Sequence, residues 1–183
     1  MKYFTISNSP IGRILMISDG ENLNALEAIG RRDIAPDGFA EKKDLPVFKS
    51  TYLWLKKYFS GENPPVLSVP IKPLEGTPFQ KIVWKILLKI PYGSTATYGE
   101  IASEVARRLG KSKMSAQAVG QAVGQNPISI IIPCHRVIGA NGNLTGYRGG
   151  IDVKIKLLEI EGIDTSRMSY PRQKQETKVV FRV

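Results

Sequence analysis

The sequence predicts a mixed α/β (α+β) protein built from a small sheet-and-helix domain followed by a mostly helical domain. β-rich segments separated by turns occupy the start of the chain, and apolar residues recur at helical spacing from residue 46 onward. Proline and glycine are densest between them, over residues 61–77. We therefore expect one domain over residues 1–74, a second over residues 75–165, and a flexible tail over residues 166–183.

The first domain begins with two strands and contains one helix. Residues 3–6 and 12–17 are β-rich and lie on either side of a turn, whereas residues 30–46 are polar and predict an irregular connection. Over residues 46–60 the apolar and aromatic side chains recur at near-helical spacing, which predicts an amphipathic helix whose aromatic residues belong to the core. Residues 66–71 are expected to add a short strand to the same sheet.

The second domain opens with strong helix signals. Thr77, Pro78 and Gln80 form a capping-box pattern ahead of an apolar stripe that reaches residue 90. A second helix is expected from Thr97 to about residue 109, and a third begins after Ser115. Residues 153–160 have the pattern of a last helix.

The second and third of these helices are joined by a short basic turn, residues 110–113, which is typical of a helix-turn-helix. The third helix contains Ala, Gly, Val and Gln but no Arg or Lys that could read guanine in the major groove. Small side chains favour shallow, sequence-tolerant contact, as in minor-groove binding. The alternative is a helix hairpin that uses Ala and Gly for tight packing.

Composition excludes several classes of protein. Of the 183 residues, 42% are hydrophobic and 23% are charged, which is ordinary for a soluble globular protein. A single cysteine cannot form an internal disulfide, and with a single histidine it makes a Cys/His zinc site implausible. The chain shows neither an apolar run of membrane-spanning length nor a signal-peptide pattern, so we expect a cytoplasmic protein without membrane association.

The net charge of +10 is concentrated in the second domain. Residues 1–74 contain 10 Lys and Arg against 8 Asp and Glu, whereas residues 75–183 contain 16 against 8. A basic half suggests a polyanionic partner such as nucleic acid, because Lys and Arg gain affinity by displacing counterions from phosphates. A solvated basic surface without a partner is an equally good interpretation of charge alone.

The stretch from residue 126 to residue 150 contains the candidate chemistry. An apolar run over residues 128–132 predicts a buried strand, and after Pro133 come Cys134 and His135, the chain's only cysteine and only histidine. A lone cysteine is most often a small buried hydrophobe. Here His135 and Arg136 are expected to favour the thiolate, which makes Cys134 a candidate nucleophile.

Pro-Cys-His-Arg-Val at residues 133–137, with Asn126 upstream and Gly-Tyr-Arg-Gly-Gly at residues 146–150, resembles the O6-alkylguanine-DNA alkyltransferase family. The resemblance covers roughly residues 1–163 and is close from about Thr77 onward. It implies a ribonuclease-H-like first domain and a winged-helix-like second domain. The implied function is direct-reversal DNA repair, in which the alkyl group of O6-alkylguanine, with O4-alkylthymine as a further candidate, passes irreversibly and stoichiometrically to Cys134.

The resemblance also implies the partners and the roles of individual residues. The partner is double-stranded DNA that contains an alkylated guanine, contacted in the minor groove by a monomer with the damaged base flipped out, and no cofactor or metal is needed. His135 would act as the base through a bridging water, Glu161 would orient it, Asn126 would position the active-site turn, and Tyr98 would donate to the purine. The implied DNA- and substrate-binding residues are Thr97, Tyr98, Gly99, Ala116, Gln117, Gly120, Arg136, Val137, Tyr147 and Arg148.

Three of these positions carry further expectations. Gln117 occupies the base-flipping position, where the family commonly has Arg. This substitution is the main departure from the family pattern, and it bears on how strongly the protein flips the base. Tyr147 would close the pocket, and the backbone amide of Arg148 would donate to the leaving oxygen. The carbonyl of Val137 would face the edge of the base.

Three alternative functions remain to be weighed. A non-reactive protein that binds alkylguanine lesions would resemble this chain but lack the cysteine, whereas Cys134 is present. A Cys/His hydrolase needs the two residues to meet from separate segments, which an adjacent pair does not provide. A helix-turn-helix regulator is disfavoured by the uncharged third helix.

Overall fold

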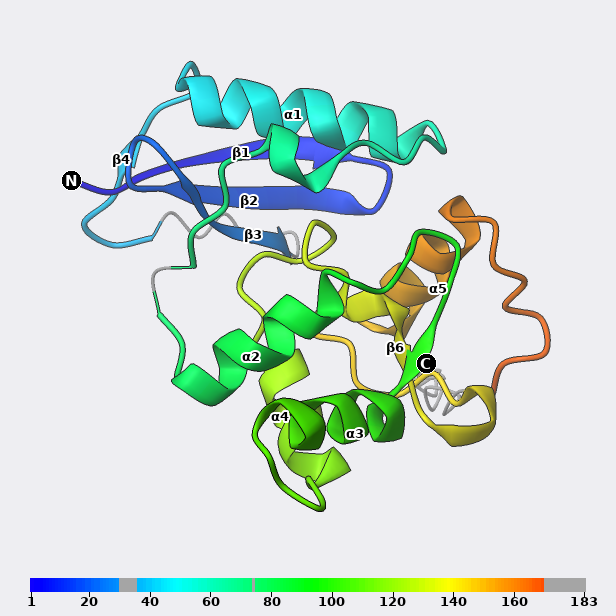
Figure 1. Ribbon diagram of the computed structural model, residues 1–183. Helices are drawn as coiled ribbons and strands as arrows, with labels where there is room; N and C mark the ends of the chain where they lie inside the picture. Colours follow the sequence, from blue (N-terminus) through cyan, green and yellow to red (C-terminus); the bar gives the residue numbers. More distant parts are fainter. Residues whose placement is uncertain (30–35, 74, 170–183) are drawn as a thin grey trace, which may run out of the picture.

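The computed structural model describes residues 1–29, 36–73 and 75–169, and its first domain is a sheet covered by one helix (Figure 1). The strands β1 (Tyr3–Ser9), β2 (Gly12–Ser18), β3 (Leu23–Ile29) and β4 (Ala40–Glu41) lie in the order β3-β2-β1-β4. β1 and β3 are antiparallel to β2, and the short β4 is parallel to β1. The first two strands confirm the prediction, but β3 was not predicted because Asn, Ala and Glu give it a weak β pattern.

Helix α1 (Pro46–Phe59) covers one face of this sheet (Figure 1), as the periodicity predicted. Its buried residues recur every three or four positions because that spacing keeps side chains on one face of a helix. They are Val47, Phe48, Thr51, Trp54, Leu55 and Tyr58. Tyr52 and Leu53 of the same helix are exposed.

The predicted strand over residues 66–71 is wrong. Val66–Ser68 form the 3-10 helix η1, and only Ile71 pairs with the sheet, through an isolated bridge to Leu23. Prolines at positions 65 and 70 have no N–H to donate, so a continuous ladder cannot form here. The segment instead attaches at one point, where the Leu23 N–H donates to the carbonyl of residue 70 at 2.7 Å.

The second domain packs α2 (Pro78–Leu87), α3 (Tyr98–Arg108) and α4 (Ala116–Gly124) against one another, followed by α5 (Ile151–Ile160) (Figure 1). The predicted N-terminal caps are present: Thr77 and Thr97 both form complete capping boxes, and Ser115 accepts from the third residue of α4. α2 ends three residues earlier than its apolar stripe suggested. The mixed α/β fold, with a sheet domain first and a helical domain second, is therefore confirmed.

Two short contacts connect the sheet to the segment that precedes Cys134. Leu26 in β3 donates its N–H to the carbonyl of Pro127 at 2.8 Å, and its carbonyl accepts from the N–H of Ser129 at 2.8 Å. In the second domain, β5 (Ala96–Thr97) pairs in parallel with β6 (Val137–Ile138). These pairings hold the segment around Cys134 between the sheet domain and the start of α3.

Of the predicted tail, residues 170–183 lie outside the described part of the chain. Ser169 forms an isolated bridge with Asn143, and its carbonyl accepts from the N–H of Leu144 at 2.7 Å. No helix within residues 1–29, 36–73 and 75–169 has both the length and the apolar character that crossing a bilayer requires.

Candidate active site

Asn126 shapes the backbone that leads to the cysteine. It is 2% exposed, and its amide donates to the carbonyl of Ile132 at 2.8 Å while its Oδ1 accepts from the N–H of Ile128 at 3.1 Å. These bonds close a buried turn in which Ile130 has a φ of 71°, a left-handed conformation that is rare and strained for a β-branched residue. The buried strand predicted over residues 128–132 is therefore wrong, because side-chain bonds from Asn126 replace a ladder.

Cys134 begins a short 3-10 helix, η2 (Cys134–Arg136), and is 6% exposed. Burial raises the pKa of the Cys134 thiol, although hydrogen bonds involving Asn126 and Ser129 and the charge of Lys154 act in the opposite direction. The expectation that the adjacent His and Arg favour a resting thiolate is therefore corrected, since desolvation outweighs the favourable charges. The thiol keeps its proton until a base removes it.

His135 and Glu161, the two residues to which the resemblance assigns acid–base roles, are hydrogen-bonded to each other. Their Nε2 and Oε1 atoms are 2.6 Å apart, and both side chains are fully buried. Burial would raise the pKa of Glu161, but hydrogen bonds from His135 and Arg136 lower it to about 2, so the group is a carboxylate that can only accept. His135 must therefore carry its proton on Nε2.

This tautomer leaves Nδ1 of His135 as the basic nitrogen. Burial lowers the pKa of His135, with Glu161 opposing the shift, so the ring is neutral at rest. Nδ1 is buried and has no hydrogen-bond partner within the described residues. A neutral imidazole with a lone pair on Nδ1 can take up the proton of the neighbouring thiol.

Arg136 orients the carboxylate. Its Nε lies 2.9 Å from Oε2 of Glu161, and its Nη1 donates to the carbonyl of Ile90 at 2.6 Å. The side chain was expected among the DNA- and substrate-binding residues, but it is only 9% exposed and is directed at Glu161. Gly93, at a positive φ of 73°, adds a backbone N–H to Oε2 at 3.1 Å.

Sequence reasoning missed two residues that reach this site. Lys154 is fully buried, and its Nζ donates to the carbonyls of Val137 at 2.7 Å and Thr145 at 2.9 Å. Burial lowers the pKa of Lys154 to about 8, while Cys134 opposes that shift. Its spacing from Leu157 and Leu158 places it on the buried face of α5, which is the signal that could have identified it.

The second missed residue is Tyr58 of α1, whose hydroxyl donates to Oε1 of Glu161 at 2.8 Å and lies 3.2 Å from Nε2 of His135. The helical periodicity of α1 correctly placed Tyr58 in the core. No local pattern could indicate that its hydroxyl reaches a residue 103 positions later in the chain.

Two phenols lie near the thiol. The hydroxyl of Tyr98 donates to the carbonyl of Thr145 at 3.3 Å, and its ring packs against Gly120 of α4, where an added Cβ would lie in ordinary van der Waals contact at 3.6 Å. Burial and the nearby Cys134 raise the pKa of Tyr98, and the same two causes raise the pKa of Tyr147 well above its usual value. Both phenols therefore keep their protons and can act as donors.

The other predicted DNA-binding positions lie on α3, α4 and the loop before α5. Gly99, Ala116 and Gln117 are exposed, while the opposite face of α4 is buried in the core. The exposed Arg148 pairs with Glu27 of β3 at 2.7 Å. Thr97 and Gly120 are partly buried, and Val137, whose carbonyl accepts from Lys154, is fully buried.

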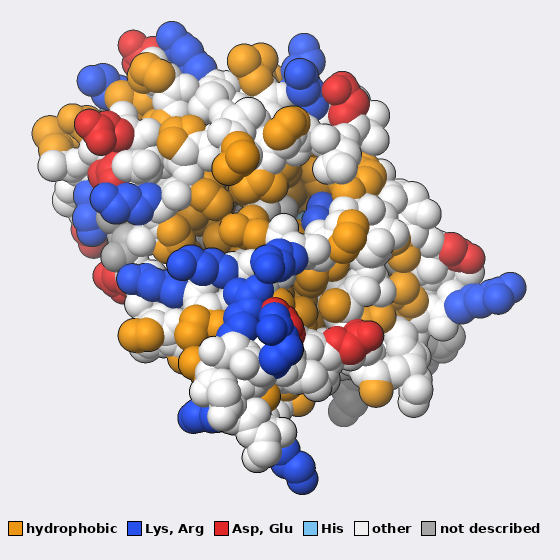
Figure 2. Space-filling model, in the orientation of Figure 1, with side chains coloured by type: hydrophobic (Ala, Val, Ile, Leu, Met, Phe, Trp, Pro, Cys, Tyr) orange, Lys and Arg blue, Asp and Glu red, His pale blue; other side chains and the backbone are white. Residues whose placement is uncertain are grey.

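Basic side chains surround this part of the surface. A groove of about 500 Å³ runs between α3 and the turn that leads to α4, and it is lined in part by Arg107, Lys111 and Lys113. Figure 2 shows a cluster of Lys and Arg side chains on one face of the molecule, next to a broad apolar area. The part of the chain that the structure describes contains no group of three or more His, Cys, Asp or Glu side chains that could hold a metal ion.

Comparisons with known proteins agree with this geometry. Residues 2–73 match the family model described as 6-O-methylguanine DNA methyltransferase, ribonuclease-like domain. Residues 78–163 match the model described as 6-O-methylguanine DNA methyltransferase, DNA binding domain. Together the two models span nearly all of the residues that the structure describes.

Individual relatives give the same result. The chain is 48% identical to the methylated-DNA–protein-cysteine methyltransferase of Methanosarcina acetivorans, over 87% of this chain and 98% of that protein. It is 43% identical to the protein of the same name from Haemophilus influenzae, over 88% and 87% of the two chains. The crystal structure of Mycobacterium tuberculosis OGT in complex with DNA matches with a TM-score of 0.74 and 41% identity, over 91% of this chain and 94% of that chain.

Proposed function

Since this chain belongs to the 6-O-methylguanine DNA methyltransferase family, we propose that its function is the direct-reversal repair of alkylated guanine in DNA. Its activity is that of a methylated-DNA–protein-cysteine methyltransferase, and it binds DNA. The observation that supports this most strongly is the pairing of Cys134 with His135, whose Nε2 is held by Glu161 at 2.6 Å. A non-reactive lesion-binding protein is not favoured, because the cysteine is present.

The reaction that we propose is an in-line displacement at the alkyl carbon. Cys134 Sγ forms a new bond to that carbon while the carbon–O6 bond breaks, and the bonding electrons return to the purine. The thiol proton leaves through Nδ1 of His135, with a water bridging the gap, and the purine gains one proton in becoming guanine. A thioether remains on Cys134, so each molecule reacts once.

Donors near the purine would stabilise the charge that develops as the C–O bond breaks. We assign Tyr98 to the ring nitrogen and the backbone N–H of Arg148 to the leaving oxygen, with Tyr147 closing the pocket. Two observations support this assignment. The hydroxyl of Tyr98 donates to the carbonyl of Thr145, two residues before Tyr147, and burial together with the charge of Cys134 raises the pKa of both phenols. Preorganised donors aimed at developing charge typically contribute a few kcal/mol.

Replacement of Tyr98 by phenylalanine should slow transfer by roughly ten- to a thousandfold, because the donor to the purine is lost. Single-turnover assays with a duplex that contains O6-methylguanine measure this rate. Tyr52→Phe, a substitution at an exposed tyrosine of α1, is the matched control and should react at the parental rate. An unchanged rate in Tyr98→Phe would remove Tyr98 from the proposed mechanism.

For DNA binding we propose that α4 lies against the minor groove and that the damaged base is flipped into the pocket beside Cys134. Exposed small residues on α4 permit close approach to the groove, and the basic groove lined by Arg107, Lys111 and Lys113 lies at the adjoining turn. O6 cannot be reached by the buried thiol while the base is stacked. The protein would do this as a monomer.

Gln117 is the residue that we propose fills the space left by the flipped nucleotide. Gln117→Ala should lower the transfer rate on duplex DNA about tenfold, since the cost of unstacking is then less well compensated. The rate with the free base O6-methylguanine should be unchanged, because no flipping is required. Gln121→Ala, one turn further along the exposed face of α4, is the control. Equal losses on duplex and free base would contradict the flipping role.

We also propose the domain division made from the sequence, with one domain over residues 1–74 and a second over residues 75–165. The support is the position of the proline-rich segment and of the two family models, which meet between residues 73 and 78.

A further inference from the structure

The side chain of Tyr58 extends from α1 of the sheet domain into the hydrogen bonds around Glu161. Its hydroxyl donates to Oε1 at 2.8 Å and lies 3.2 Å from Nε2 of His135. We propose that Tyr58 is a positioning residue for the proton transfer from Cys134, acting through Glu161 and His135. The inference rests on the roles proposed above for this pair, and it gives the sheet domain a direct part in the chemistry.

The polarity of the hydrogen bonds defines what the hydroxyl does. Glu161 is a carboxylate and only accepts, and Nε2 of His135 points its proton at Oε1. The Tyr58 hydroxyl must therefore donate to Oε1 as well. Arg136 also donates to both carboxylate oxygens, at 3.0 Å to Oε1 through Nη2 and at 2.9 Å to Oε2 through Nε. Tyr58 is thus a second neutral donor to Oε1, beside His135, and holds this oxygen in the position that His135 needs.

Ring packing alone would not require a tyrosine here. The Tyr58 ring stacks on Trp54 with centroids 5.4 Å apart and meets Tyr92 edge-on at 6.1 Å, contacts that phenylalanine would also make. Tyr58 is 1% exposed, and a buried hydroxyl without a partner destabilises the folded state. Among the described residues, this hydroxyl meets Glu161 and His135, the two members of the pair. The hydroxyl is therefore explained by the site rather than by the core.

The charged and titratable groups around the pair come from every element packed against it. Besides Tyr58 of α1, they are Tyr92 in the turn after α2, Cys134 and Arg136 in η2, and Lys154 of α5. Burial raises the pKa values of Tyr58 and Tyr92, so both phenols remain neutral, whereas Cys134, Arg136 and Lys154 carry charge or exchange the proton. Its removal leaves Oε1 with more unshared negative charge facing His135.

The expected consequence is a change in the acid–base behaviour of His135. With Tyr58→Phe, the more negative Oε1 stabilises the imidazolium and raises the pKa of His135. A raised pKa moves the acidic limb of the pH–rate profile for transfer to higher pH, by about one unit, because a hydrogen bond to the carboxylate is lost. At pH values on that limb the transfer rate should fall about tenfold, while the rate on the alkaline side changes little.

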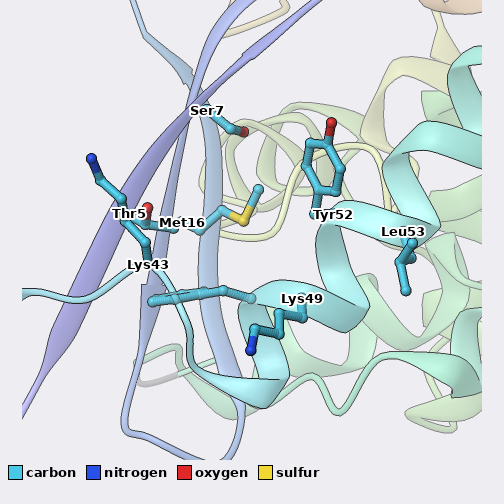
Figure 3. Close-up of a pocket in the computed structure, with 8 residues that line it drawn as sticks. Thr5, Ser7, Met16, Lys43, Lys49, Tyr52 and Leu53 are labelled. Carbon is cyan, nitrogen blue, oxygen red and sulfur yellow. The ribbon is translucent and has the colours of Figure 1, made fainter.

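The chain suits this test because it contains one histidine and one cysteine. In ¹⁵N-histidine NMR, all signals therefore come from His135, and the wild-type ring should be the Nε2–H tautomer. Tyr58→Phe is compared with Tyr52→Phe, the same substitution on the exposed side of α1. Figure 3 shows Tyr52 and Leu53 at the pocket of about 390 Å³ between α1 and the sheet, which Tyr58 does not line.

The positioning role predicts that Tyr58→Phe alone shifts both the NMR titration of His135 and the acidic limb of the profile. A lower melting temperature with both curves unchanged would show a purely structural role and overturn the inference. Should Tyr58→Phe not fold, NMR of the wild-type protein still tests the inference. The Tyr58 hydroxyl proton should exchange slowly with water and lie close to the His135 ring. Rapid exchange with water would contradict the positioning role. If wild-type protein transfers no methyl group, the proposed function fails, whereas the NMR result stands separately.

Discussion

Cys134→Ser should abolish methyl transfer while leaving the binding of O6-methylguanine DNA close to that of the parent protein. A serine hydroxyl keeps nearly the shape of the thiol, but it is a far weaker nucleophile at neutral pH. His135 cannot compensate, because a neutral imidazole in a buried site removes a proton from a thiol much more readily than from an alcohol. The decisive assay incubates excess protein with a methylated duplex and quantifies the O6-methylguanine that remains.

The same variant separates chemistry from recognition. Fluorescence anisotropy should show that Cys134→Ser still binds the methylated duplex more tightly than the unmethylated one, and that it binds the unmethylated duplex as the parent protein does. Thermal unfolding should be nearly unchanged, because a buried serine can use the same Asn126 and Ser129 neighbours that act on the thiol. Residual repair by the variant at more than a trace of the parental rate would mean that another residue accepts the methyl group.

Glu161→Gln should cause the second largest loss of transfer activity, because it removes the charge that holds His135 and Arg136 in place. Arg136 becomes a buried cation without its partner, and breaking a buried pair in this way costs about 3–5 kcal/mol of stability. The amide can also present N–H to Nε2, which favours the wrong tautomer of His135. Transfer should fall by about a hundredfold or more at a temperature where the variant is folded.

The stability effect has a defined pH dependence. The pKa of Glu161 is about 2 in the folded protein, below its ordinary value of 4.5. Its contribution to stability is therefore fully present above pH 4.5 and is lost as the pH falls towards 2. Urea denaturation across this window should show a smaller decline for Glu161→Gln than for the parent. The control is Glu159→Gln, an exposed carboxylate on the same helix whose bond is to Thr165.

An unchanged transfer rate in Glu161→Gln, with wild-type stability, would contradict the role assigned to the His135–Glu161 pair. A loss of stability without a loss of rate would assign Glu161 to structure alone. Both outcomes are read against Glu159→Gln.

The sequence was most informative where the physical signal is local. The caps at Thr77, Thr97 and Ser115 were predicted because a side-chain oxygen meets an N–H three residues later, whatever surrounds the helix. The adjacency of Cys134 and His135 is equally local and can be seen in the sequence itself. The resemblance then indicated Glu161 and Asn126. In the structure Glu161 is hydrogen-bonded to His135, and Asn126 is hydrogen-bonded to the backbone of the turn before Cys134.

Long-range contacts account for what was missed. The apolar run over residues 128–132 looks like a strand, but Asn126 bonds it into a turn and β3 takes only a single bridge from it, at Ile128. Tyr58 follows the ordinary periodicity of a core helix, and nothing near it in the sequence indicates that its hydroxyl bonds to Glu161. The thiolate was expected from neighbouring charges, whereas burial proved to be the larger effect on the pKa of Cys134.

The most direct test of the central claim is intact mass spectrometry of the protein after incubation with duplex DNA that contains O6-methylguanine, followed by peptide mapping. The account predicts that one methyl group replaces one hydrogen, that it maps to Cys134, and that methylation stops at one equivalent while excess substrate remains. A protein whose mass is unchanged while the lesion disappears, or a methyl group on any other residue, would contradict it.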